Sequence, residues 1–163
     1  ITAFRFFTVY GPWGRPDMAL FKFVDAILHD RPIDIYNNGS MYRDFTYVDD
    51  LVKSIKYLIN VIPKINCKKS DHEYVNEIDI STPFRIVNIG NSQKIKLLDF
   101  INEIENVLEK KAKRNYLPIQ LGDVPETWAD TTLLQKLINF SPRTDYKEGI
   151  SNFVKWYRKY YKI

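Results

Sequence analysis

The chain has 163 residues, of which 45% are apolar, 15% aromatic and 27% charged. This composition excludes a disordered tail and predicts a hydrophobic core, and the sequence holds no apolar run of the roughly 18 residues that would span a membrane. With one cysteine and two histidines, we expect neither a disulfide framework nor a metal centre, and the cysteine content fits the cytoplasm.

The formal net charge of +4 does not by itself indicate a nucleic-acid-binding protein. The last nine residues hold four basic residues and no acidic one, and the rest of the chain carries as many basic as acidic residues. Cations at the end of a helix suit the helix dipole. We therefore expect no nucleic-acid partner.

The start of the chain predicts a strand followed by a rigid loop. Residues 1–10 are rich in β-branched and aromatic types, and two glycines and two prolines punctuate residues 11–17. Gly11 and Gly14 predict a turn rather than a dinucleotide-binding loop, because Pro12 and Pro16 remove backbone donors. Since the chain begins without methionine inside a strand pattern, we expect it to be a fragment of something longer.

Helices and strands alternate in the rest of the sequence, which predicts the α/β class. Apolar periodicity and turn residues predict helices near 20–28, 48–62, 97–108, 131–138 and from about 146, with extended segments at 33–36, 43–47, 85–90 and 115–121. The polar residues 63–83 indicate a surface excursion. The 48–62 helix has the strongest apolar face, formed by Val48, Leu51, Val52, Ile55, Leu58, Ile59 and Ile62.

Four polar or aromatic residues lie where a ligand could be bound. Arg43 offers a planar fork for a diphosphate, or pairs with a neighbouring acid such as Asp44. Arg15, in the Gly/Pro loop, presents a cation or is simply solvated. Tyr36, at a strand end, stacks on a base or belongs to the core. Asp123 follows Gly122 and accepts ribose hydroxyls or fixes a turn.

Five segments in order carry a family resemblance: residues 5–19 (RFFTVYGPWGRPDMA), 38–50 (NGSMYRDFTYVDD), 88–91 (NIGN), 122–124 with 128–130 (GDV and WAD) and 149–157 (GIxxFVxWY). Together they resemble the C-terminal half of NAD-dependent nucleotide-sugar epimerases of the extended short-chain dehydrogenase/reductase family, and most closely the UDP-glucuronate 4-epimerases. The resemblance implies the C-terminal portion of a Rossmann-type epimerase, with the N-terminal NAD-binding half missing. Residues 1–17 would complete the Rossmann region and the substrate loop, and 18–163 would be mainly the substrate domain with returning sheet segments.

The resemblance also implies an activity and roles for individual residues. Such epimerases serve polysaccharide biosynthesis: NAD takes a hydride from C4 of a UDP-sugar, and the hydride returns to the other face of the 4-keto intermediate. Thr8 matches the residue at the sugar ring and its carboxylate, and Arg15 an arginine on an anionic part of the substrate. Tyr36 matches the aromatic at the uracil, Arg43 the diphosphate arginine and Asp123 the residue at the uridine ribose.

The cofactor side of the family pattern is almost absent. Phe6 and Phe7 match residues beside the nicotinamide, but the sequence has no Gly-x-x-Gly-x-x-Gly loop and no tyrosine followed four places later by lysine. We therefore expect no catalytic residue in this chain and no activity of the chain alone. The alternatives are another epimerase, dehydratase or decarboxylase of the family, or a non-catalytic remnant that self-associates or joins a separate N-terminal half.

Overall fold

The computed structural model describes residues 1–64 and 83–163, and most of the predicted excursion at 63–83 lies outside them. The described strands are β1 (Thr2–Phe6), β2 (Thr8–Tyr10), β3 (Pro32–Ile35), β4 (Tyr42–Arg43), β5 (Phe45–Tyr47), β6 (Arg85–Ile89), β7 (Ile95–Lys96) and β8 (Lys113–Tyr116). The described helices are α1 (Ala19–Leu28), the 3-10 turn η1 (Tyr36–Gly39), α2 (Val48–Ile59), α3 (Leu97–Leu108), α4 (Thr132–Ile138) and α5 (Tyr146–Tyr161). The predicted α/β class is confirmed.

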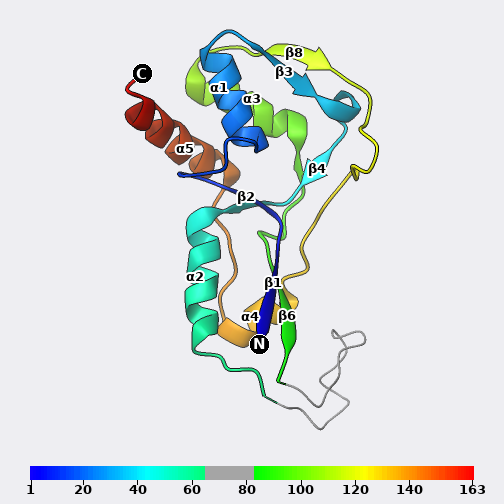
Figure 1. Ribbon diagram of the computed structural model, residues 1–163, viewed down its shortest axis with the longest axis vertical. Coiled ribbons are helices and arrows are strands. Elements are labelled where there is room, and N and C mark those ends of the chain that lie inside the picture. The colour runs from blue at the N-terminus through cyan, green and yellow to red at the C-terminus, as the bar shows by residue number, and fades with distance from the viewer. Residues whose placement is uncertain (65–82) are drawn as a thin grey trace.

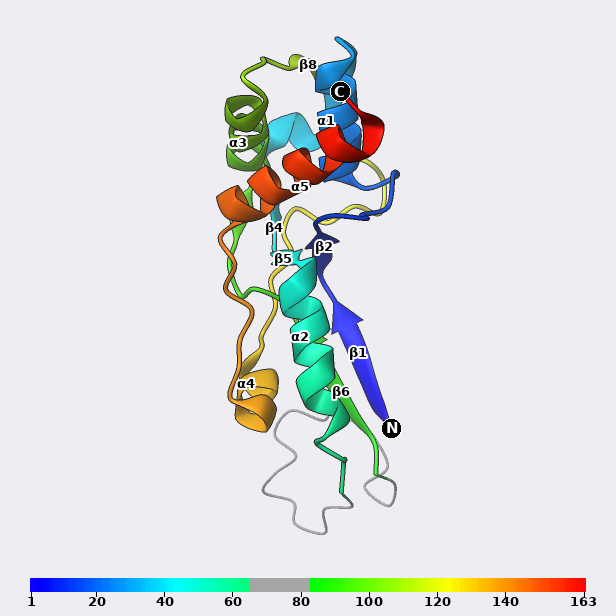
Figure 2. The same ribbon diagram turned by 90° about the vertical axis from the view of Figure 1, so that its left-hand side faces the viewer.

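The molecule is elongated and has two lobes, with β2 and β5 between them (Figures 1 and 2). One lobe holds α1, α3 and α5 with the parallel pair β3–β8, and the other holds α2 and α4 with the parallel pair β1–β6. Each lobe has its own hydrophobic cluster. The chain crosses between the lobes several times, so residues distant in sequence meet at the junction.

Aromatic side chains dominate the core of the α1–α3–α5 lobe. Phe45 and Phe100 stack with their ring centroids 3.8 Å apart, and Tyr10 meets both rings edge-on. The helix predicted from about residue 146 is confirmed as α5, and its Phe153 and Tyr157 are almost fully buried. This packing fixes α5 beside the loop that follows β2 (Figure 2).

The apolar face predicted for residues 48–62 is only partly buried. Leu51 and Leu58 pack into the core of the smaller cluster, whereas Val52, Ile59 and Ile62 are 57%, 71% and 76% exposed. The predicted helix is confirmed at Val48–Ile59, but the described part of the chain covers only some of its apolar residues. Periodicity identifies the helix, but it does not say whether the chain supplies a surface for every apolar residue on it.

Two strand predictions need correction. Residues 1–10 form two strands, because the run bends at Phe7: β1 pairs with β6 and β2 with β5. The strand predicted at 115–121 is displaced to Lys113–Tyr116, where the chain pairs with β3. Pairing with β3 decides the position of this strand, although the apolar residues lie after it. Within the described ranges, no helix has the length and apolar character needed to cross a membrane.

Candidate functional site

A cleft of about 690 Å³ collects residues from six separate segments. Thr8 begins β2, Tyr36 follows β3, Arg43 ends β4 and Asp123 lies in a turn after β8, and all four line this cleft. Met18 and its neighbours at the start of α1 form another wall. The structure thus brings together four of the five residues that the sequence singled out for substrate binding.

Arg43 and Asp123 form an ion pair in the cleft. Arg43 Nη2 donates to Asp123 Oδ1 at 2.8 Å, and Nη1 donates to the backbone oxygens of Tyr42 and Pro125. The Arg43 side chain is 18% exposed and that of Asp123 32%. Asp123 also fixes its own turn, since its carboxylate accepts the amide hydrogen of Val124. These bonds hold the guanidinium in one orientation.

Arg43 does pair with an acid, as one alternative expected, but the partner is Asp123 and not the adjacent Asp44. The Asp44 side chain is fully buried, and its carboxylate accepts hydrogen bonds from the backbone amides of Asn91, Ser92 and Ala129 at 2.7–3.1 Å. Its backbone oxygen accepts the amide hydrogen of Thr8 at 3.0 Å. Asp44 therefore ties together the segments that carry Arg43 and Thr8.

Gly90 lies against this buried carboxylate. A Cβ atom at Gly90 would stand 2.3 Å from Cβ of Ala129 and 3.0 Å from Oδ2 of Asp44. A side chain at this position would push apart the segments that Asp44 joins. The glycine is therefore required for close approach of the backbone.

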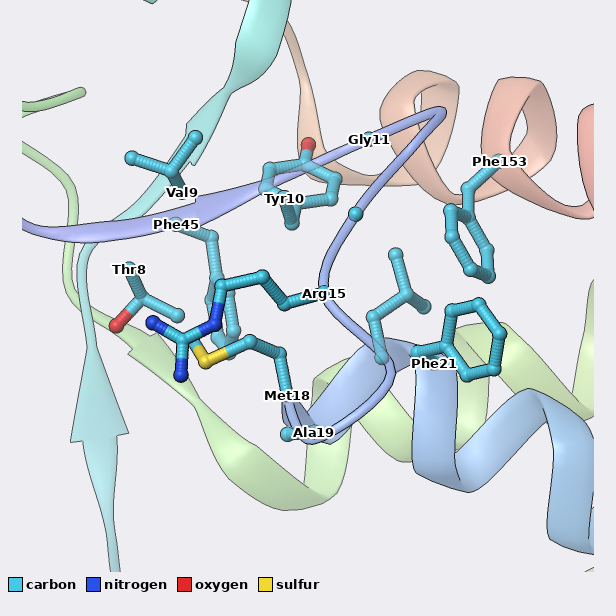
Figure 3. Close-up of a pocket in the computed structure, with 12 residues that line it drawn as sticks. Thr8, Val9, Tyr10, Gly11, Arg15, Met18, Ala19, Phe21, Phe45 and Phe153 are labelled. Carbon is cyan, nitrogen blue, oxygen red and sulfur yellow. The ribbon is translucent and has the colours of Figure 1, made fainter.

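Arg15 lies beside the main cleft, at a small hollow of about 20 Å³ that Thr8 also lines (Figure 3). Figure 3 shows the Arg15 side chain extending toward the side of the hollow where Thr8 lies. The Arg15 side chain is 75% exposed, and its guanidinium pairs with Asp17, which lines the main cleft. The hydrogen bond from Arg15 lowers the pKa of Asp17. The predicted turn at Gly11–Gly14 is confirmed by a hydrogen bond from the Gly14 amide to the Gly11 oxygen.

Tyr36 is half-buried and is held by backbone bonds on both sides. The Leu117 amide donates to the Ile35 oxygen at 2.9 Å, and the Asn38 amide donates to the Leu117 oxygen at 3.1 Å. The 3-10 turn after Tyr36 places Asn37 and Asn38 at positive φ, which asparagine tolerates better than most residues. The ring therefore lines the cleft from a fixed position.

Several charged residues of the cleft were not singled out from the sequence, among them Lys22 and Asp25 of α1. Lys22 on α1 lines the cleft and takes part in none of the ion pairs found among the described residues. Asp25, one turn later, binds Arg31 and accepts a hydrogen bond from the Tyr157 hydroxyl at 2.8 Å. Burial acts to raise the pKa of Asp25, but these hydrogen bonds outweigh it and hold the pKa below its usual value. Helical periodicity from Met18 would have placed Lys22 on the same face.

Phe6 and Phe7 do not line this cleft. Phe6 ends β1, is 50% exposed and stacks on Phe4 with ring centroids 5.9 Å apart. Phe7 is half-buried at the bend between β1 and β2. The two residues matched to the nicotinamide are thus not among the residues that line the cleft, although Phe7 directly precedes Thr8 in the chain.

Comparison with known proteins supports the resemblance. Residues 1–75 match the NAD dependent epimerase/dehydratase family. The chain is 50% identical over 161 residues to a probable UDP-glucuronate 4-epimerase of Rhizobium meliloti, covering 99% of this chain and 47% of the relative. It is 39% identical over 166 residues to UDP-glucuronate 4-epimerase 2 of Arabidopsis thaliana, covering 99% and 37%.

The fold comparison agrees. UDP-glucuronic acid 4-epimerase from Bacillus cereus, solved with UDP-glucuronic acid and NAD, superposes with a TM-score of 0.78 at 29% identity, covering 97% of this chain and 45% of that one. The chain spans about half the length of the curated relatives that it matches first. By sequence and fold it is related to the NAD-dependent nucleotide-sugar epimerases, with a Rossmann-type architecture. Among these, the UDP-glucuronate 4-epimerases are the particular relatives that both comparisons identify.

Proposed function

We propose that this chain is the UDP-sugar-binding part of an NAD-dependent UDP-glucuronate 4-epimerase. The observation that carries the proposal is the single cleft lined by Thr8, Tyr36, Arg43 and Asp123. In this assignment Tyr36 stacks on the uracil, Asp123 accepts the ribose hydroxyls, Arg43 binds the diphosphate and Thr8 contacts the sugar. The named ligands of the Bacillus cereus relative, UDP-glucuronic acid and NAD, support it.

The chemistry of Arg43 suits a diphosphate. A guanidinium has five N–H donors in one plane, and three hydrogen bonds to Tyr42, Pro125 and Asp123 orient it among the described residues. The remaining donors can bind phosphate oxygens without moving the side chain. Because the plane is already fixed, binding loses little rotamer entropy.

A uronate is the preferred sugar in this proposal. Thr8 offers a hydroxyl, and Arg15 offers a cation from a loop that reaches the same hollow (Figure 3). The Arg15–Asp17 pair is exposed, and exposed ion pairs contribute little stability. Arg15 can therefore exchange Asp17 for a substrate carboxylate. A neutral-sugar epimerase, a dehydratase or a decarboxylase of the family is the alternative.

NAD in the proposed enzyme would accept the C4 hydride and return it to the other face of the sugar. The residues of this chain do not fit a complete NAD site, because the sequence has neither the phosphate-binding glycine loop nor the Tyr-x-x-x-Lys pair. Phe6 and Phe7 would contribute only a nicotinamide-side wall. We therefore expect the chain alone to bind substrate and to leave it unconverted.

The lobe that holds α2, α4 and the β1–β6 pair offers a surface for the missing NAD-binding half that would complete the site. β1 pairs with β6 on one edge only among the described strands, and exposed strand edges and apolar patches favour association. Val52, Ile59 and Phe6 are exposed on this lobe. In our proposal this surface binds a separate N-terminal half or a second copy of the chain. Measurement of the molecular mass at rising protein concentration, with and without the N-terminal half of a relative, tests this second proposal. A chain that stays monomeric throughout contradicts it.

The first experiment is a conversion assay with a binding arm. The chain is incubated with NAD and UDP-glucuronate, and we expect no UDP-galacturonate to form. In parallel, calorimetry compares UDP-glucuronate with UDP-galactose, and we expect the uronate to bind about tenfold more tightly. Equal affinities favour the neutral-sugar alternative, and conversion by the chain alone contradicts the proposed division of the site.

A further inference from the structure

The loop that carries Arg15 contains an unusual residue at its tip. The Gly14 amide donates to the Gly11 oxygen at 3.1 Å, which closes a β-turn with Pro12 and Trp13 in the middle. Trp13 has a φ of +63°. The third position of a turn with proline second and positive φ third is one that glycine or asparagine normally takes. A tryptophan there is strained, so something outside the turn must favour it.

Contacts with α5 supply that stabilisation. The Trp13 ring lies 5.4 Å from the ring of Trp156 and 5.3 Å from that of Tyr160, measured between centroids. Trp156 and Tyr160 also stack on each other at 5.5 Å. α5 is itself anchored in the core through Phe153, so the tip of the loop is fastened to a rigid element (Figure 2).

The exposed tryptophan therefore has two aromatic partners on α5. Trp13 is 74% exposed, and burial of the ring cannot explain its position. The residue two places later, Arg15, has little else to hold it, since its only ion pair among the described residues is with exposed Asp17. The Met18 amide donates to the Arg15 oxygen at 3.1 Å and joins the loop to α1. The loop is thus fixed at both ends and at its tip.

We propose that Trp13 is a positioning residue that holds the Arg15 loop beside the cleft and thereby sets the preference for a carboxylate-bearing sugar. The inference rests on the proposed function, because it assumes that Arg15 meets the substrate. The contacts of Trp13 with Trp156 and Tyr160 keep the backbone of Arg15 in place, and the exposed Asp17 releases the guanidinium to the substrate. Trp13 itself contacts no substrate.

The test uses variants that separate the turn from the ring. Trp13→Gly relieves the backbone strain at the positive φ and removes the ring contacts with α5. Tyr160→Leu keeps the turn and removes one of the two aromatic partners of Trp13. Tyr161→Leu is the matched control, because it lies on the same helix and its ring contacts run to Phe21, Tyr157 and Tyr160. Calorimetry measures the affinities of each variant for UDP-glucuronate and UDP-glucose.

We expect Trp13→Gly to reduce the preference for UDP-glucuronate about fivefold or more, while its affinity for UDP-glucose changes by less than about twofold. Tyr160→Leu should act in the same direction and Tyr161→Leu should leave the preference unchanged. An unchanged preference in Trp13→Gly overturns the inference.

A wild-type chain that binds neither UDP-glucuronate nor UDP-glucose contradicts the proposed function. In that case, hydrogen exchange tests directly whether Trp13 holds the loop in place. The amides of Gly14 and Met18 should exchange about tenfold faster in Trp13→Gly than in the wild type and the Tyr161→Leu control. Equal exchange rates overturn the inference whether or not UDP binds.

Discussion

Arg43 Nη2 lies 2.8 Å from Asp123 Oδ1, although the two residues are 80 positions apart in the chain. The adjacent acid, Asp44, points into the core instead. Successive side chains in an extended chain lie on opposite sides, so an arginine that faces a cleft places its neighbour inside. This alternation explains how one dipeptide supplies both a cleft-facing cation and a structural carboxylate.

The proposed roles of Asp123 and Arg43 differ in the part of the nucleotide that each contacts. Asp123→Ala removes the ribose acceptor, so we expect the affinities for uridine and UDP to fall together, each by about fivefold. Calorimetry with both ligands makes this comparison. If only the affinity for UDP falls, the ribose assignment is contradicted, and Asp123 acts only by orienting Arg43.

Removal of the Asp44 carboxylate should be strongly destabilising. Asp44→Ala leaves three buried amide donors without their acceptor, and each unsatisfied group costs about 1–3 kcal/mol. We expect the free energy of unfolding, measured with urea, to fall by about 3 kcal/mol or more. Thr46→Val removes one weaker donor to the same carboxylate and should cost about 1 kcal/mol. Equal losses in both variants contradict the role given to Asp44.

The buried carboxylate of Glu105 predicts a pH dependence of stability. Burial acts to raise its pKa, but hydrogen bonds from Lys111, Arg114 and the Ala112 amide outweigh it, so the pKa lies below its usual value. A lowered folded-state pKa stabilises the protein fully above the unfolded pKa of about 4.3, and this contribution is lost as the pH falls through the lower folded value.

The Glu105→Gln variant measures this contribution. We expect the free energy of unfolding to fall by about 2 kcal/mol at pH 7, with the difference from wild type shrinking below about pH 4. Glu103→Gln removes a carboxylate from the same helix and should change stability by less than about 0.5 kcal/mol. A Glu105→Gln difference that is constant from pH 7 to about pH 3 contradicts the pKa direction.

Stacking on Tyr36 should contribute equally to every uridine nucleotide. We expect Tyr36→Leu to weaken uridine, UDP and UDP-glucuronate by the same factor, about fivefold, because the ring is assigned to the base alone. Tyr57→Leu removes an exposed aromatic on α2 that packs against Phe140 and should change none of the three affinities. Unequal losses would place Tyr36 elsewhere in the cleft.

Sequence patterns predicted much of this molecule for identifiable reasons. The α/β class and the helix boundaries follow from periodicity, which reports local geometry. Most candidate ligand-binding residues were singled out because each ends a strand or lies in a loop or turn, whereas Thr8 came from the family resemblance alone. Four of these predicted residues line one cleft. Their roles toward UDP-sugar stay predictions.

Long-range pairing could not be predicted in this way. The polar strand β8 forms at Lys113–Tyr116 because β3 is its partner, and the more apolar residues after it do not extend the strand. The local sequence equally gives no sign that Arg43 pairs with Asp123. Nor does it show that the Asp44 carboxylate accepts hydrogen bonds from three distant backbone amides. Such contacts depend on how the segments meet at the junction of the lobes.

Titration of UDP into the wild-type chain and the Arg43→Ala variant tests the central claim most directly. Arg5→Ala, an exposed arginine of β1, is the control. We predict micromolar binding to the wild type and to Arg5→Ala, and a loss of at least tenfold, or about 1.4 kcal/mol, in Arg43→Ala. Absence of UDP binding to the wild type, or equal binding by all three proteins, contradicts the assignment of the cleft to a UDP-sugar.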